Sequence, residues 1–152
     1  MKQAIAFATG VLAMTSAAAA PPSRPAVEHF GRPAVNGRPL PFSEAVRVGD
    51  ILYLSGQIGI GPDGKLPEGI EAQTRQALDN IGAVLKRAGV GYGNVFHCTA
   101  MLADMKDWPD FNKAYLEYFP DPPLPTRSAF GANGLALGAL LEIECQAYAG
   151  KK

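Results

Sequence analysis

The sequence is poor in residues that bind metals, and it lacks the charge excess that binds nucleic acids. It has two histidines and two cysteines in 152 residues, and none of them are paired at a spacing typical of a metal site. Lysine plus arginine and aspartate plus glutamate both number 14, and there is no basic run. The sequence therefore predicts no metal site and no metal cofactor. It also predicts no basic surface for binding RNA or DNA.

Long apolar runs are also scarce, and the longest lies at the N-terminus. Lys2 gives a positive start, residues 4–14 are mostly apolar or small, and four alanines precede Pro21-Pro22. This layout is typical of a secretory signal peptide, and its apolar run is shorter than the roughly 20 residues of a membrane span. We expect a signal peptide over residues 1–19, cut after Ala18 or Ala19, and an exported, periplasmic or secreted protein with no membrane segment after cleavage.

The two cysteines, Cys98 and Cys145, each lie in an apolar, strand-like run. The favoured interpretation is a pair of buried thiols that act as small hydrophobic side chains. A disulfide is the alternative, because export would permit one. The sequence alone does not give their separation in space.

The rest of the chain divides into an arm and one domain. Residues 20–40 are rich in Pro, Arg and Gly without a period, which indicates an extended arm or linker. Residues 41–150 have the size of a single domain. Apolar periodicity predicts strands at 43–48 and 51–56 around Gly49-Asp50, a helix at 70–88 ended by Gly89, a strand at 95–102, a helix capped by Asp107, a strand from Arg127 and a strand at 140–148. The order β-β-α-β-α-β-β predicts an α/β (α+β) domain with some parallel pairing.

Two charged residues late in the chain suggest a chemistry. Arg127 begins one predicted strand, and Glu142 lies on the next, which we expect to return beside it. A guanidinium can pair two donors with a substrate carboxylate, and a carboxylate can order a water molecule and move protons. The pair predicts hydrolysis of a small carboxylate-bearing substrate. The alternative is a structural ion pair between Arg127 and Glu142 or Glu144.

Five blocks of sequence, in order, carry a resemblance to a known family. They are residues 49–58, 73–81, 111–115, 125–128 and 138–144. On these blocks the chain resembles the Rid family (YjgF-like reactive intermediate deaminases, RidA-like) over about residues 41–149. The resemblance implies a chorismate-mutase-like fold: one mixed sheet, two helices on one face, and a homotrimer with a central barrel and clefts between subunits.

The same resemblance implies a reaction and the residues that perform it. The reaction is the cofactor-independent hydrolysis of reactive 2-imino and enamine acids, of the 2-aminoacrylate type, to 2-keto acids and ammonia, as in a 2-iminobutanoate/2-iminopropanoate deaminase. Arg127 matches the family arginine that grips the substrate carboxylate. Glu142 matches the carboxylate that positions or activates water. Asn112 and Gly56 match positions that line the cleft.

Departures from the family pattern leave other functions open. Phe42 stands where the family usually has a tyrosine, and Ala129 where it often has a cysteine; both are expected to line the substrate cleft, Phe42 as an apolar wall. Leu135-Ala136 replaces the usual Leu-Pro. A non-catalytic trimer that binds small carboxylates or client proteins is therefore the alternative. A ribonuclease or translation inhibitor is a remote one, disfavoured by the neutral charge.

Overall fold

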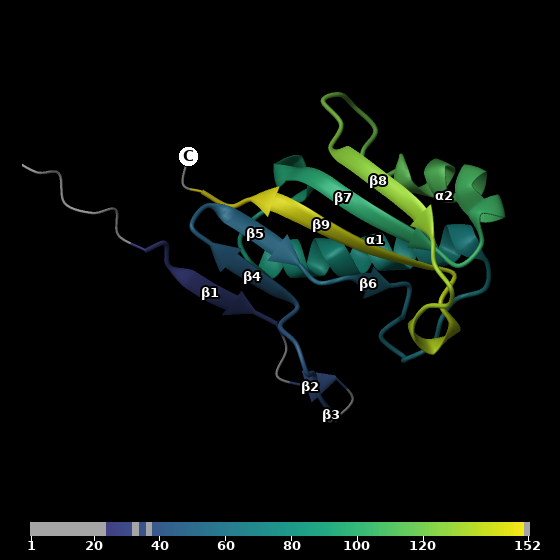
Figure 1. Ribbon diagram of the computed structural model, residues 1–152, viewed down its shortest axis with the longest axis horizontal. Helices are drawn as coiled ribbons and strands as arrows, with labels where there is room; N and C mark the ends of the chain where they lie inside the picture. Colours follow the sequence, from purple (N-terminus) through teal and green to yellow (C-terminus); the bar gives the residue numbers. More distant parts are fainter. Residues whose placement is uncertain (1–23, 32–33, 36–37, 151–152) are drawn as a thin grey trace, which may run out of the picture.

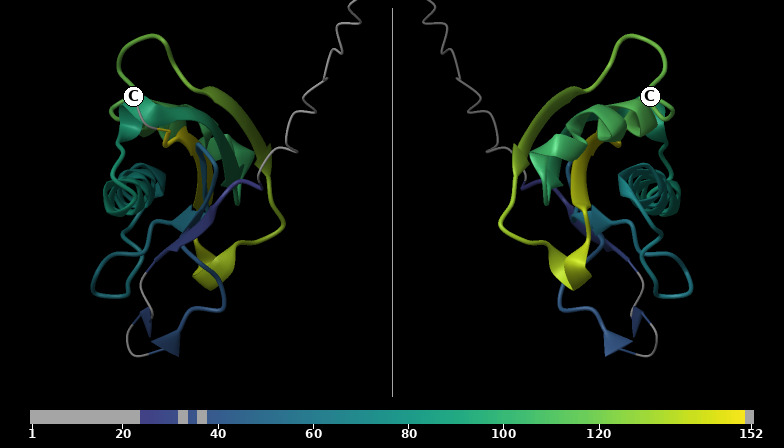
Figure 2. Two further views of the ribbon diagram at one scale, coloured as in Figure 1. Left: turned by 90° about the vertical axis from the view of Figure 1, so that its left-hand side faces the viewer. Right: turned by 90° about the vertical axis from the view of Figure 1, so that its right-hand side faces the viewer.

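The computed structural model of the protein describes residues 24–31, 34–35 and 38–150, in which one curved sheet carries two helices on one face (Figures 1 and 2). The sheet order is β1-β4-β5-β9-β7-β8, with β6 beside β9. Its strands are β1 (Val27–Phe30), β4 (Ala45–Val48), β5 (Ile51–Leu54), β6 (Gln57–Ile58), β7 (Val95–Leu102), β8 (Thr126–Gly131) and β9 (Leu141–Tyr148). The predicted architecture and element order are confirmed. The predicted signal peptide, residues 1–19, lies outside the described residues.

The first helix, α1 (Ile70–Arg87), follows the predicted apolar stripe. Its buried residues recur at steps of three and four and pack against the sheet: Ile70, Thr74, Ala77, Leu78, Ile81, Val84 and Leu85. The helix ends before Gly89, whose φ of 78° is a conformation that glycine adopts without strain. None of the described helices is long and apolar enough to cross a membrane.

The second helix, α2 (Trp108–Tyr115), is short and begins where it was predicted, after Asp107. Asp107 precedes it, as predicted, but its backbone is already helical and its side chain makes no capping bond. The capping prediction is thus wrong in its mechanism: Asp104 accepts a hydrogen bond from the Lys106 amide in the turn before. Phe119 lies beyond the end of the helix and still enters the core, where its ring stacks on Tyr115 at 4.8 Å between centroids.

The strand order differs from the expected one between the strands that carry Arg127 and Glu142. β7 and β8 pair in parallel through the α2 crossover, so some parallel pairing is present, as predicted. The long helix α1, which suggested that pairing, joins β6 to β7, and these two strands do not pair. β9 pairs with β5 on one side and with β7 on the other. The strand of Glu142 therefore does not return beside the strand of Arg127, because β7 lies between them. The expectation of adjacent strands was wrong.

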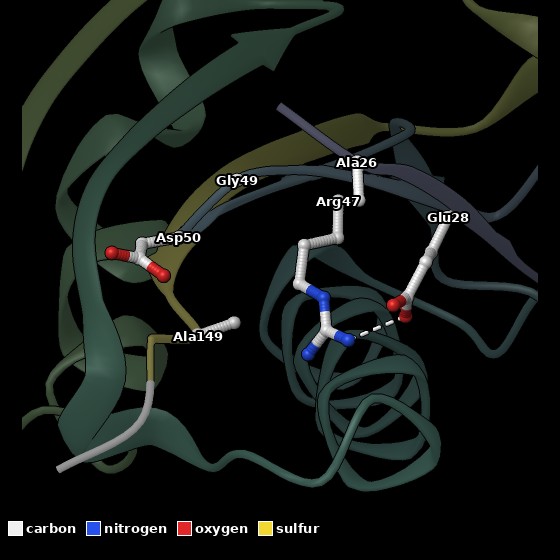
Figure 3. A pocket seen from close by; sticks show the side chains of 6 residues that line it. All are labelled: Ala26, Glu28, Arg47, Gly49, Asp50 and Ala149. Atoms are coloured by element: carbon white, nitrogen blue, oxygen red, sulfur yellow. Dashed lines mark hydrogen bonds and ion pairs between the residues drawn. The ribbon is translucent and has the colours of Figure 1, made fainter. Parts of the chain in front are cut away.

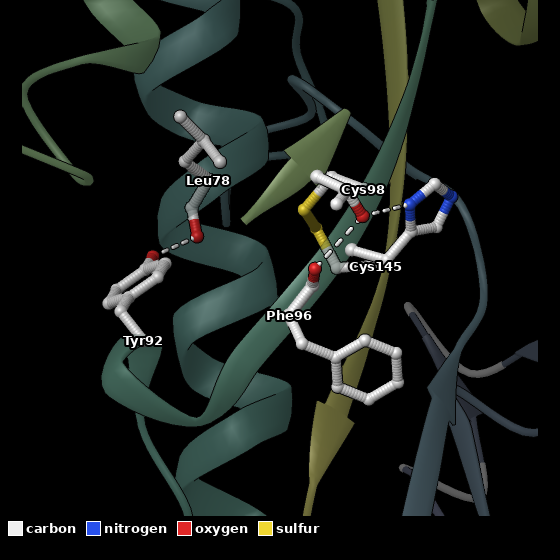
Figure 4. The surroundings of a disulfide bond; sticks show 7 residues. Leu78, Tyr92, Phe96, Cys98 and Cys145 are labelled. Carbon is white, nitrogen blue, oxygen red and sulfur yellow. Dashed lines mark hydrogen bonds between the residues drawn. A yellow bond between two sulfur atoms is a disulfide. The ribbon is translucent and has the colours of Figure 1, made fainter. Parts of the chain in front are cut away.

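A disulfide joins Cys98 on β7 to Cys145 on β9 (Figure 4). The two residues are direct partners in the antiparallel ladder, with their Cα atoms 4.1 Å apart. Both are buried under the helices, as predicted. The favoured interpretation as free thiols was wrong, because the register of two strands 47 residues apart in sequence brings the sulfurs together.

Part of the predicted arm belongs to the sheet. Val27–Phe30 pairs antiparallel with β4 and forms the edge strand β1. A short ladder between β2 (Ala34–Val35) and β3 (Arg38–Pro39) follows it (Figure 1). The sequence signal was weak because the exposed edge strand shows almost no burial pattern. Residues 27–30 of the arm therefore extend the sheet by one edge strand.

Candidate functional site

Arg127 lies on the helix-covered face of the sheet. It is the parallel partner of Cys98, whose side chain points to the helices, so the arginine emerges on the same side. There its guanidinium carbon lies over three rings of α2, at 4.9, 5.2 and 4.4 Å from the centroids of Trp108, Phe111 and Tyr115. Such contacts stabilise a cation and restrict its position.

Asn112 fixes the orientation of this guanidinium. Arg127 Nη2 donates a hydrogen bond to Asn112 Oδ1 at 2.6 Å. Among the described residues no carboxylate forms an ion pair with Arg127, so the alternative of a structural pair with Glu142 or Glu144 is absent within this chain. Burial lowers the pKa of Arg127 from its usual value. The result is a partly desolvated, oriented cation without an anion.

The contact of the α2 aromatics with Arg127 was not predicted from the sequence. Positions 108, 111, 112 and 115 are three or four residues apart, so they share one helix face. That spacing was the available signal. Tyr115 is buried, which raises its pKa to about 12, and its hydroxyl has no hydrogen-bonding partner among the described residues. The ring of Tyr115, and not its hydroxyl, serves the arginine.

Glu142 lies on the opposite, open face of the sheet. Leu141 and Ile143 on either side of it are buried under the helices, so the alternation of β9 turns Glu142 outward. Its carboxylate lies against Gly56: a Cβ atom at Gly56 would be 1.9 Å from Glu142 Oε1. Gly56 and Phe42 also line one cavity of about 280 Å³. Three of the predicted site residues are thus gathered here.

A methyl group at Gly56 is expected to displace the Glu142 carboxylate. The atoms it would meet are Glu142 Oε1, Cδ and Cγ, at 1.9, 2.7 and 3.0 Å, and these are the far end of a flexible side chain. Gly56→Ala should therefore leave the unfolding midpoint nearly unchanged and lower any activity that depends on Glu142 at least tenfold. Gly93→Ala is the matched control, because nothing lies within 4 Å of its added Cβ. Equal activity of both variants would separate Gly56 from the function of Glu142.

The two groups of residues do not meet within one chain. Arg127 pairs with Cys98 and Glu142 with Met101 on the shared strand β7. Three residues along a strand and two strand spacings place their Cα atoms about 14 Å apart. Their side chains also leave opposite faces of the sheet. Within a single chain, Arg127 and Asn112 form one half-site, and Gly56, Phe42 and Glu142 form another.

Ala129 and His97 lie outside the two half-sites. Ala129 follows Arg127 by two on β8, faces the helices and packs partly buried against the core. His97 lies on β7, where its Nδ1 is 2.8 Å from Thr126 Oγ1. The described residues contain no cluster of three or more His, Cys, Asp or Glu side chains that could hold a metal ion.

A cavity of about 350 Å³ (Figure 3) shares no lining residue with either half-site. It is formed where the end of the arm meets the β4–β5 turn, with Ala26, Gly49, Asp50 and Ala149 around it. Its one cation, Arg47, is already paired with Glu28. None of the predicted site residues lines this cavity.

The geometry can now be compared with known proteins. The family model described as Endoribonuclease L-PSP matches residues 35–149. The chain belongs to this family, the YjgF-like Rid proteins. A crystal structure of a Rid family protein of unknown function from Yersinia pestis is 38% identical, with a TM-score of 0.75 over 81% of this chain and 99% of that one. This confirms both the resemblance and the fold.

Curated relatives of this Rid family member carry deaminase names. A 2-iminobutanoate/2-iminopropanoate deaminase of Mus musculus is 42% identical over 112 residues, 72% of this chain and 82% of the relative. Reactive Intermediate Deaminase A of Arabidopsis thaliana is 42% identical over 107 residues, 69% of this chain but only 57% of the relative. Escherichia coli TdcF, solved with bound serine, is 28% identical with a TM-score of 0.72 over 80% of this chain and 98% of TdcF.

Proposed function

We propose that the protein hydrolyses reactive 2-imino and enamine acids, of the 2-aminoacrylate type, to 2-keto acids and ammonia without a cofactor. The observation that carries the proposal is Arg127, a half-buried cation oriented by Asn112 and three rings, with no acidic partner in the described chain. Such a group fits a substrate carboxylate. The deaminase names of the relatives and the serine bound to TdcF, itself a small carboxylate, support the assignment.

The reaction requires the protein mainly to position the substrate and a water molecule. The imine carbon is already electrophilic and can be attacked by water. Arg127 binds the substrate carboxylate and thereby holds this carbon in position for the attack. Glu142 accepts a proton from the water as its oxygen bonds to the imine carbon, and returns a proton to the nitrogen. The carbinolamine then loses ammonia and leaves the 2-keto acid. An enamine first takes a proton at its β-carbon and follows the same course.

This assignment requires more than one copy of the chain. Because Arg127 and Glu142 leave opposite faces of one sheet, a site that contains both must take the Arg127 half from one subunit and the Glu142 half from a neighbour. A homotrimer with clefts between subunits satisfies this requirement. The open sheet face, which carries exposed Tyr53, Phe130 and Tyr148, provides the apolar surface for such an assembly.

Export completes the proposal. Residues 1–19 have the layout of a signal peptide, and the remaining arm and domain, 20–40 and 41–150, would form the mature protein. The Cys98–Cys145 disulfide supports export, because such bonds persist in oxidising compartments. The substrate would then be an imine formed in the periplasm or outside the cell.

The direct test is ammonia and keto-acid release from imines made in situ by an amino-acid oxidase. Arg127→Ala should lower kcat/KM by about 10²–10³-fold, since it removes one partner of a buried charge pair. Arg127→Lys, the matched variant, keeps the charge and loses the planar fork, so its activity should lie between the two. If wild type and Arg127→Ala both match the uncatalysed rate, the enzyme assignment fails.

A binding role is the second candidate, and Phe42 favours it. Phe42 presents no hydroxyl to the cavity it lines, so its side chain offers neither a proton donor nor a proton acceptor. Binding of small carboxylates that depends on Arg127, without ammonia release, would establish this role. Ribonuclease activity, which the description of the family model names, would require salt-sensitive RNA binding by a chain with a formal net charge of +0.

A further inference from the structure

The cavity beside Gly56 is lined mainly by apolar side chains. Its volume is about 280 Å³, and Leu40, Phe42, Ile58, Ile60 and Leu137 form most of its wall. They come from the arm, from the β6 region and from the loop before β9, so three separate segments converge on it. Ligand sites are commonly concave, mostly apolar cavities with a few polar groups at defined places.

Two large apolar residues of this wall are left in contact with solvent. Phe42 is 52% exposed and Leu137 is 73% exposed. Leu137 has a φ of 58°, in the left-handed region that branched side chains rarely adopt. An exposed leucine held in such a conformation gains nothing from the core, and residues in such conformations concentrate at ligand sites. A bound apolar group would bury both side chains.

The charges around the cavity are acidic and partly neutralised. Glu44 lines the cavity, is only 2% exposed and accepts a hydrogen bond from Arg87 Nη2 at 2.7 Å. Glu142 lies just behind Gly56. Two carboxylates disfavour an acidic ligand group, and the Arg87 pair leaves Glu44 little attraction for a cationic one. An uncharged, apolar group fits best.

We infer that this cavity binds the side chain of the substrate, and that the preferred substrates are 2-imino acids with aliphatic or thioether side chains of three or more carbons. The inference rests on the proposed function, which places the imine carbon near Glu142 and the carboxylate on Arg127. The cavity would be the third point of contact with the substrate, after Arg127 and Glu142. The imine derived from alanine, or 2-aminoacrylate, would leave the cavity empty and Leu137 exposed.

The test is a chain-length series with the mature wild-type protein. Imines are made by an oxidase from alanine, 2-aminobutyrate, norvaline and norleucine, and from glutamate as an acidic probe. The kcat/KM value should rise about fourfold with each added methylene, the factor expected for burying one CH₂ group. The glutamate imine should be hydrolysed no faster than the alanine imine. A flat or falling series would overturn the inference and leave the deaminase function intact.

Variants and a second readout keep the two proposals separate. Leu137→Ala should reduce the norleucine-to-alanine ratio of kcat/KM, whereas the same substitution at Leu124, which is also exposed but lies outside the cavity, should keep it. Calorimetric binding of 2-keto acids needs no catalysis: 4-methyl-2-oxopentanoate should bind more tightly than pyruvate, and Leu137→Ala should remove the difference. If the hydrolysis of no imine is accelerated, the deaminase proposal is refuted. The binding of the two 2-keto acids then decides by itself whether the cavity binds the side chain. Equal binding of both acids would refute it.

Discussion

Two inactive variants, Arg127→Ala and Glu142→Gln, are expected to restore about a quarter of the wild-type deaminase activity when they are refolded together in equal amounts. The two half-sites lie on opposite faces of one sheet, so each complete site takes its arginine from one subunit and its glutamate from another. With random assembly, half of the sites receive an intact arginine and half of these also receive an intact glutamate. Each variant alone should retain only residual activity.

A matched control strengthens this experiment. The double variant Arg127→Ala/Glu142→Gln, refolded with an equal amount of wild type, should also give about a quarter of full activity if the site is shared between subunits, but about half if one chain supplies both residues. Variants refolded separately and then mixed should stay inactive unless subunits exchange. No recovery in the first mixture, with half activity in the second, would contradict the shared site and the assembly proposed with it.

The shared site also shows how far the sequence could lead. Alternation along residues 140–148 separates Glu142 and Glu144 from the buried Leu141 and Ile143, because side-chain direction in a strand follows local periodicity, which the sequence already shows. Strand order is a non-local property. The insertion of β9 between β5 and β7 leaves no trace in the pattern of either strand. The roles of Arg127 and Glu142 as a chemical pair therefore stay a prediction, now distributed over two half-sites, while their expected adjacency within one chain was wrong.

The same limit explains the cysteines and the cavity. The apolar runs around Cys98 and Cys145 predicted burial, but only the register of β7 against β9 makes them partners. Gly56 was proposed from a family block and Phe42 from a departure from the family pattern, whereas Leu137 joins them through a left-handed loop that periodicity does not describe. Local chemistry predicted the elements and their faces. Contacts between distant segments required the folded chain.

Reducing the Cys98–Cys145 disulfide is expected to lower the free energy of unfolding by about 4 kcal/mol, the chain-entropy value for a loop of this length. The bond spans 47 residues and ties β7 to β9 at the centre of the sheet. Urea unfolding of the oxidised protein should therefore be compared with protein that was unfolded with dithiothreitol and refolded in its presence. Native protein should resist the reductant, because both cysteines are buried.

The outcome bears on where the protein works. A typical domain is stable by about 5–15 kcal/mol, so a loss of about 4 would leave the reduced chain marginal in a reducing compartment and stable only after export. In the variant Cys98→Ala/Cys145→Ala, the reductant should change neither the midpoint nor the slope of urea unfolding. This control separates the effect of breaking the disulfide from other effects of the reagent. Thiol titration of the unfolded, unreduced protein should find no free thiol. Two free thiols per chain, or equal stability with and without reductant, would remove the disulfide as a support for export and leave the leader segment as its only basis.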